Sequence, residues 1–161
     1  MSKQLQFIFN PSELGAGTRG ASLGPEAVRC AAREQQSTLF ADHPVLTLAH
    51  RNDLLDRPTP YAYAKRIDGV LQVFETVKNH VKETIDSGKF PLIIAGDHGS
   101  AGGTMAGLKL AFPGKRLGVL WIDAHADIHS PYTTPSGNIH GMPIATALGI
   151  DQSDLQKNNL D

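Results

Sequence analysis

Residues 117–129 read LGVLWIDAHADIH, an apolar run followed at once by acidic and imidazole side chains. The run from Leu117 to Ile122 predicts a buried strand. Because side chains alternate along a strand, we expect Asp123, His125 and Asp127 to project from one side, where the strand gives way to a loop. The chemistry of the protein is therefore predicted to lie at the end of this strand.

Three other short apolar runs predict strands, and stretches with helical periodicity separate them. The strands are expected near residues 6–9, 45–48 and 92–95. The clearest helix should span Tyr61 to Ser87, where apolar residues recur at spacings of three and four. Shorter helices are expected near residues 25–33, after Ser100, and from about Met142. Strands that alternate with helices are typical of βαβ units, so we predict an α/β fold with a mainly parallel sheet.

The composition is that of an ordinary folded domain. A chain of 161 residues, 40% of them hydrophobic, suffices for one domain with its own core, which we place at residues 1–161. Its 15 basic and 16 acidic residues include no basic block, which argues against binding to nucleic acid or to an anionic membrane. No signal segment or run of roughly 18 apolar residues is present, so we expect a cytoplasmic protein. Cys30, the single cysteine, is expected to be a small buried residue of its helix.

The side chains after residue 122 suit a transition-metal ion. Carboxylate oxygens mixed with imidazole, without a thiolate, favour Mn²⁺, Fe²⁺ or Co²⁺ over a structural zinc site. His98 follows the strand at 92–95, and ligands of open α/β sheets bind beyond the carboxyl ends of strands, so His98 is a candidate fourth ligand. Its neighbour Asp97 is predicted to brace the loop by hydrogen bonds rather than to bind metal. The alternative is a capping and turn cluster, because Asp and His are common in loops.

Two motif matches are rejected by their context. Residues 15–20, GAGTRG, match the dinucleotide fingerprint, but residues 10–14 separate them from the strand and the helix begins only near Pro25. Ser100 would need a glycine in place of His98 to form a nucleophile elbow. We therefore expect neither a dinucleotide cofactor nor a catalytic serine.

A second polar stretch, SGNIHG at residues 136–141, follows the metal cluster closely. Ser136, Asn138 and His140 offer a hydroxyl, an amide and an imidazole in one turn. Such groups can hold a zwitterionic substrate and relay a proton near neutral pH. An ordinary polar turn before the next helix is the alternative.

These motifs together resemble the ureohydrolase family, and within it the arginases. The resemblance rests on GDH at residues 96–98, DAHADI at 123–128 and SGNIHG at 136–141, in the family's order and spacing, with support from residues 15–29. It implies a three-layer α/β/α fold with a mainly parallel sheet. It also implies manganese-dependent hydrolysis of L-arginine to ornithine and urea, by a metal-bound hydroxide at a site for two Mn²⁺ ions. The complete protein would be a homo-oligomer that binds a small guanidino substrate.

The resemblance implies a role for each metal-site residue. His98, Asp123 and Asp127 would hold one manganese ion and His125 the other, with Asp123 bridging the two. Metal coordination agrees with the chemistry, because a guanidinium carbon is a poor electrophile and a bound metal lowers the pKa of water toward roughly 7 to 9.

The resemblance also implies roles at the substrate. His140 resembles the family's proton-relay histidine, and Thr134, Ser136 and Asn138 resemble its contacts to the amino acid end of arginine. His129 occupies another substrate-contact position, where arginases usually have asparagine.

The resemblance does not extend to the family's C-terminal half, which supplies an Asp-x-Asp motif and a substrate-binding Glu. After Asp127 the only acids are Asp151, Asp154 and Asp161, and none is in that arrangement. The family also usually has serine where this chain has Gly99. Four side chains cannot complete the coordination of two five- or six-coordinate ions, so we interpret the chain as the N-terminal half of an arginase-like protein, with an incomplete fold and site. Two other hypotheses remain: a ureohydrolase for agmatine or another guanidino compound, and a non-catalytic truncated fragment.

Overall fold

A three-stranded parallel sheet forms the centre of the protein, seen here in a computed structural model that describes residues 4–160. The strands are β1 (Leu5–Asn10), β2 (Val45–Thr47) and β3 (Phe90–Ala95), in the order β2-β1-β3. In the register, Phe7 of β1 pairs with Val45 on one side and with Leu92 on the other. The three strands lie where the sequence predicted them, and the prediction of an α/β fold with a parallel sheet is confirmed.

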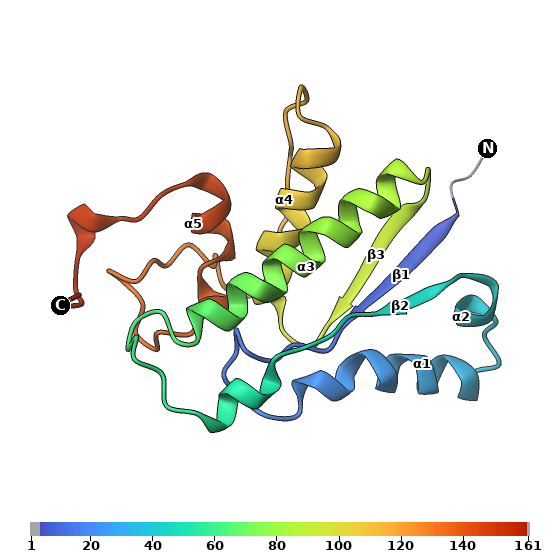
Figure 1. Ribbon diagram of the computed structural model, residues 1–161, viewed down its shortest axis with the longest axis horizontal. Coiled ribbons are helices and arrows are strands. Elements are labelled where there is room, and N and C mark those ends of the chain that lie inside the picture. The colour runs from blue at the N-terminus through green and yellow to red at the C-terminus, as the bar shows by residue number, and fades with distance from the viewer. Residues whose placement is uncertain (1–3, 161) are drawn as a thin grey trace.

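Helices pack on both faces of this sheet (Figure 1). The helices of the described chain are α1 (Gly24–Glu34), α2 (Leu39–Asp42), α3 (Ile67–Asp86), α4 (Ala101–Ala111) and α5 (Pro143–Leu148), of which α4 packs mainly on α3 and α5 on α4. Because β1 lies between its two partners, right-handed crossovers place α1 and α3 on opposite faces. The rings of Phe7 and Phe9 accordingly contact Phe40 of α2, whereas Ile8 between them belongs to the core cluster formed with α3.

The core lies mainly between the sheet and α3. Four valines of α3 recur at spacings of three and four and are buried against the sheet: Val70, Val73, Val77 and Val81. Val77 and Val81 also lie against α4, where a Cβ at Gly107 would be 2.8 Å from Val81 Cβ. A Cβ at Gly103 of α4 would lie 2.7 Å from the carbonyl oxygen of Phe74, so glycine permits this approach although it weakens α4 as an isolated helix.

Helix α3 begins at Ile67, later than the predicted start at Tyr61. Residues 61–66 instead cross the turn at Gly137, where Lys65 N donates a hydrogen bond to the Gly137 carbonyl at 2.9 Å. A Cβ at Gly137 would lie 2.0 Å from the Ala62 carbonyl oxygen. This tertiary contact between distant segments replaces the first helical turns that the apolar periodicity predicted.

The predicted fourth strand at residues 117–122 is wrong in the described structure, because this segment pairs with no strand. Leu120 and Ile122 are 87% and 89% exposed, and the outer edge of β3 has no strand beside it within residues 4–160. A strand needs a hydrogen-bonded neighbour and a covered apolar face, and this segment has neither within the described residues. The period of two therefore does not position the metal-site residues.

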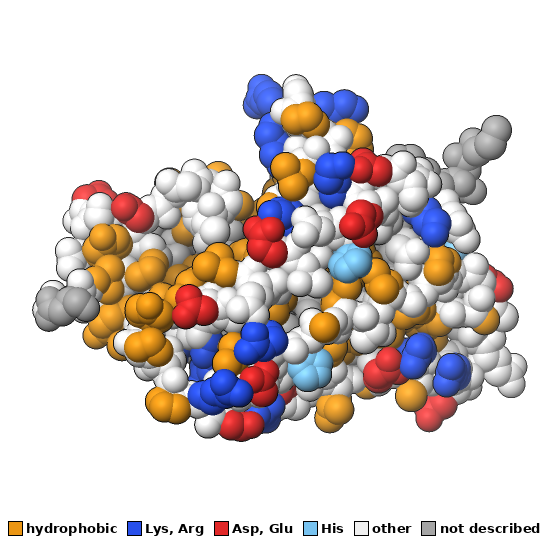
Figure 2. Space-filling model, in the orientation of Figure 1, with side chains coloured by type: hydrophobic (Ala, Val, Ile, Leu, Met, Phe, Trp, Pro, Cys, Tyr) orange, Lys and Arg blue, Asp and Glu red, His pale blue; other side chains and the backbone are white. Residues whose placement is uncertain are grey.

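Two surface features bear on the expectations from composition. Cys30 lies on the exposed side of α1, so the prediction that it is buried is wrong. On the face shown in Figure 2, acidic and basic side chains are interspersed, as the even charge balance predicts. Within residues 4–160, no helix has the length and apolar character needed to cross a bilayer.

Candidate metal centre

Three side chains from two separate segments converge beyond the carboxyl end of β3. His98 lies in the 3-10 helix His98–Ser100 that follows β3, and Asp123 and Asp127 lie in the loop after residue 122. One potential ligand atom from each residue lies within 4.8 Å of the other two. These are the three residues predicted to share one ion, and the structure brings them together without the expected strand.

Hydrogen bonding orients His98 for such a role. Its Nε2 lies 2.8 Å from the carbonyl oxygen of His140, and because a carbonyl can only accept, Nε2 carries the hydrogen. The lone pair is then on Nδ1, which lies 3.7 Å from Oδ2 of Asp123. A backbone hydrogen bond that fixes the outer nitrogen of a histidine is the usual way to orient a metal-binding imidazole.

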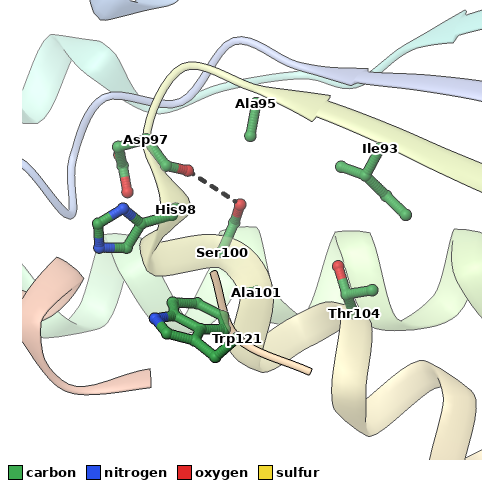
Figure 3. A pocket seen from close by; sticks show the side chains of 8 residues that line it. All are labelled: Ile93, Ala95, Asp97, His98, Ser100, Ala101, Thr104 and Trp121. Carbon is green, nitrogen blue, oxygen red and sulfur yellow. Dashed lines mark hydrogen bonds between the residues drawn. The ribbon is translucent and has the colours of Figure 1, made fainter. Parts of the chain in front are cut away.

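Asp127 is the buried member of the group, and its neighbours offer donors to the carboxylate. Trp121 Nε1 donates to Asp127 Oδ2 at 3.1 Å, and His98 Nε2 lies 3.3 Å from the same oxygen. The Trp121 ring also meets the His98 ring edge-on, with centroids 5.8 Å apart, next to Ala101 (Figure 3). Sequence reasoning missed Trp121, although the sole tryptophan of the chain, two residues before Asp123, was an available signal.

His125 lies beside the group rather than within it. Its side chain is 82% exposed, and its Nδ1 is 3.5 Å from Asp123 Oδ1. The two oxygens of Asp123 therefore face different imidazoles, Oδ2 toward His98 and Oδ1 toward His125. The hydrogen bond from His125 N, aided by the two nearby imidazoles, lowers the pKa of Asp123 despite some desolvation, so its carboxylate is ionised at neutral pH.

Asp97 braces the neighbouring loops, as predicted, through contacts to backbone rather than to the metal group. Its carboxylate accepts hydrogen bonds from Gly99 N at 2.8 Å and from Gly15 N at 3.1 Å. Burial raises the pKa of Asp97, although these bonds oppose the rise. The Gly15 carbonyl in turn accepts from His140 N at 3.1 Å. The Asp97 carboxylate thus ties the N-terminal glycine-rich loop to the turn of His98, and the Gly15 carbonyl ties the same loop to the turn of His140.

A cavity of about 360 Å³ opens beside the metal group and gathers most of the predicted site. Its lining includes seven of those residues: His98, His125, Asp127, His129, Thr134, Ser136 and His140. The rings of His98 and His140 stack there with centroids 5.3 Å apart. Asn138 is different, because its Nδ2 donates to the Ala16 carbonyl at 2.9 Å and so faces the N-terminal loop.

A buried carboxylate that sequence reasoning missed, that of Glu13, binds the backbone of the glycine-rich loop. Glu13 is 2% exposed, and its Oε2 accepts hydrogen bonds from Gly20 N and Ser22 N, both at 2.9 Å. Burial alone would raise the pKa of Glu13, but these bonds and Arg19 together lower it. Glu13 thus occupies two backbone N–H groups at the end of the glycine-rich loop.

Comparison with known proteins identifies relatives of this chain. The sequence matches the family described as "Arginase family" over residues 3–158. It is 37% identical to arginase of Bacillus subtilis over 162 residues and 38% identical to arginase of Brevibacillus brevis over 166. Both alignments cover 96% of this chain and 51% of the relative, so the chain spans about half the length of the curated relatives it matches.

Solved structures of arginases also match the fold of this chain. Native arginase from Bacillus caldovelox superposes with a TM-score of 0.77 at 35% identity, over 96% of this chain and 52% of that one. Entamoeba histolytica arginase in complex with L-ornithine gives a TM-score of 0.78 at 29% identity, over 95% and 51% of the two chains. The structure is therefore arginase-like, with part of that fold covered.

Proposed function

Because this chain belongs to the arginase family, we propose that the protein containing it hydrolyses L-arginine to ornithine and urea with the help of manganese. The observation that carries this proposal is the convergence of His98, Asp123 and Asp127 within 4.8 Å. The adjoining cavity of about 360 Å³ is large enough for a small guanidino compound.

The donor set fits the proposed metal. His98, Asp123 and Asp127 would hold one ion, and the second oxygen of Asp123 together with His125 would contribute to another. Carboxylate and imidazole without thiolate suit Mn²⁺. When bound, manganese lowers the pKa of water and so supplies a nucleophile near neutral pH.

His140 is suited to move the proton that this hydrolysis requires. Its ring lies on the cavity wall, stacked on His98, and its backbone is held between Gly15 and His98. A positioned imidazole can donate a proton to a leaving amine and recover it from water. We propose this role for His140, with no requirement that it touch the metal.

Thr134, Ser136 and His129 lie on the same cavity wall and would bind the amino acid end of the substrate. Thr134 is buried, with its Oγ1 accepting from Gly137 N at 3.1 Å, so its hydroxyl hydrogen remains available to an acceptor. Asn138, held by Ala16, would act on the substrate by shaping the loop.

Agmatine or another guanidino compound is the alternative substrate, and His129 is the observation that favours testing it. Arginine carries a carboxylate that agmatine lacks, whereas both carry an ammonium group. The ratio of kcat/KM for arginine to that for agmatine decides between them. A ratio below one would overturn the assignment to arginine and retain the chemistry.

The metal dependence is tested by urea release from the complete protein after chelation and after readdition of Mn²⁺. Activity should disappear and return. His140→Ala should lower kcat by about 10²- to 10⁴-fold while metal content by elemental analysis stays unchanged. His80→Ala, a surface histidine of α3 paired with Glu83, is the matched control. Undiminished turnover in protein shown to be metal-free would refute the proposal.

A non-catalytic role for the 161-residue chain taken alone is the second candidate. Its support is the exposed segment 117–122, the unpaired outer edge of β3 within the described residues, and a metal group of three side chains. Two cations near one carboxylate repel each other unless other anions offset the repulsion. The purified chain with excess Mn²⁺ should therefore release no urea and should self-associate. Robust turnover by a monomeric 161-residue chain would rule this candidate out.

A further inference from the structure

The turn that ends α4, residues 109–116, concentrates positive charge on the surface and is called the basic turn below. Lys109 lies in the last turn of α4, and Lys115 and Arg116 follow the helix, whereas residues 98–122 contain no Asp or Glu. The basic turn projects from the rest of the molecule (Figure 1), and Figure 2 shows basic side chains gathered at its end. A chain whose net charge is -1 therefore carries a local excess of three positive charges.

No carboxylate neutralises the three cations of the basic turn. Within residues 4–160, none of them forms an ion pair with an acidic side chain. On the neighbouring helix α3, by contrast, Lys82 pairs with Asp86. Like charges that lie close together repel each other, and an anion between them offsets the repulsion. The counter-charge of the basic turn must therefore come from the solvent or from a ligand.

The three cations line one small cavity of about 90 Å³, and apolar side chains complete its wall: Leu108, Phe112 and Leu117. Lys115 Nζ lies 5.0 Å from the centroid of the Phe112 ring. The Arg116 guanidinium has no hydrogen-bond partner among the residues that the structure describes. Apolar walls lower the local dielectric constant, which strengthens the attraction between a cation and an anion. The cavity thus combines free hydrogen-bond donors with surroundings that favour pairing with an anion.

The end of a helix is the usual explanation for basic residues in such a place, and here it accounts for one of the three. Carbonyl oxygens at the end of a helix attract cations. Lys109 Nζ donates to the carbonyl oxygens of Pro113 and Lys115 at 3.0 and 2.8 Å, so this side chain holds the turn together. Lys115 and Arg116 lie beyond the last residue of α4, and their side chains donate to no carbonyl oxygen within the described residues. These two side chains are therefore free to bind a ligand.

We propose that Lys115 and Arg116 bind a phosphate group in this cavity, either as the free ion or at the end of a small phosphorylated compound. The cavity has the volume of roughly three water molecules, which suits one compact oxyanion. The planar guanidinium can donate two parallel hydrogen bonds to a phosphate, and the lysine adds a point charge. Helix α4 has 11 residues at about 1.5 Å each, so it separates this site from the turn of His98 by roughly 16 Å. The phosphate site lies apart from the metal centre, and it does not depend on the proposed hydrolysis.

Calorimetric titration of the complete protein with inorganic phosphate tests the proposal, with manganese removed because the metal itself binds phosphate. One saturable site is expected. Arg116→Gln should weaken binding about tenfold, the loss of a hydrogen bond between charged groups, and Arg116→Lys by a smaller factor because it keeps the charge without the planar fork. Lys115→Gln should also weaken binding. Arg33→Gln is the matched control, because Arg33 is an exposed arginine in the last turn of α1. An equal loss in Arg33→Gln, or native affinity in Arg116→Gln, would overturn the proposal.

Phosphate can also be presented by a lipid headgroup, and two further measurements separate these sources. Methyl phosphate should bind with nearly the affinity of inorganic phosphate, because the rest of the compound projects into solvent. Vesicles of phosphatidylcholine with phosphatidic acid should not retain the protein on sedimentation. Retention on vesicles without saturable binding of either soluble phosphate would refute the proposal. The substituted side chains are exposed, so the variants should unfold at the native urea concentration, and this measurement separates a lost contact from a lost fold.

Discussion

The strand core, which is β1, β2 and β3 with α3, and the metal loop, residues 117–129, contain similar apolar runs but have opposite environments. Ile8 in the middle of β1 is 0% exposed, with a strand on each side and helices on both faces. Ile122 in the metal loop is 89% exposed and belongs to no strand. An apolar run thus becomes a buried strand only where other segments cover it and pair with its backbone.

A similar difference separates the carboxylate next to the strand core from those of the metal loop. Glu13, which follows β1, has its charge satisfied by the N–H groups of its own loop. Asp123 and Asp127 in the metal loop have imidazoles as close neighbours and retain free lone pairs. We infer that substitutions in the strand core change stability, whereas substitutions in the metal loop change metal binding.

The largest expected effect comes from one substitution made in both regions. Ile8→Ala should lower the free energy of unfolding by about 2–5 kcal/mol, because it leaves a cavity in the core. Ile122→Ala should change it by less than about 0.5 kcal/mol, because the side chain is already in water. Urea unfolding of the 161-residue chain at low concentration measures both. Equal costs would mean that the metal loop is buried in solution.

Asp127→Asn should lower affinity for Mn²⁺ by about 10- to 100-fold, because it removes a charged member of the three-residue group. His125→Ala should also lower metal occupancy, by a smaller factor, since His125 lies outside that group. Both variants should unfold at nearly the native urea concentration. Calorimetric titration with Mn²⁺ gives the affinities, and Asp154→Asn is an exposed control. Full occupancy in both variants would contradict their assignment as ligands.

Glu13→Gln tests the buried carboxylate in the loop that follows β1. The pKa of Glu13 is lowered in the folded protein, so its charge stabilises the fold above the ordinary glutamate pKa, and this stabilisation is lost as the pH falls through the folded value. Glu13→Gln should therefore cost about 1–2 kcal/mol at pH 7 and progressively less as the pH falls below about 4.5. Unfolding curves across this pH range measure the difference, and Mn²⁺ affinity should remain native. A difference independent of pH would exclude the ionised form as the cause.

Trp121→Phe should have the smallest effect in this series. It removes the Nε1 hydrogen bond to Asp127 and keeps an aromatic ring beside His98. The loss of one hydrogen bond, about 1 kcal/mol, should weaken Mn²⁺ binding about fivefold. The same titration tests it, with the Asp127→Asn result as the upper limit. A loss larger than that of Asp127→Asn would show that Trp121 organises the entire metal loop.

Local pattern accounted for the parts of the fold that are paired and covered. The apolar runs of β1, β2 and β3 and the periodicity of α3 predicted their places within a few residues, except for the start of α3. Helix α3 was predicted to begin at Tyr61 but begins at Ile67, because residues 61–66 contact Gly137, which lies far away in the sequence. Cys30 and the segment 117–122 were predicted to be buried from their apolar neighbours, but burial depends on which other segments are present to cover them.

The sequence by itself determined which residue types are available to the candidate site, and from them it predicted the chemistry of that site. The residue types at 98, 123, 125 and 127 predicted a metal rather than a nucleotide, and the resemblance predicted which three would share an ion. Only the tertiary structure decided how they meet: it set Nε2 of His98 beside the His140 carbonyl oxygen, placed Asp123 between two imidazoles, and brought Trp121 to Asp127. Hydrogen bonds act over about 3 Å between atoms that folding brings together, so spacing along the chain names the participants but does not reveal their directions.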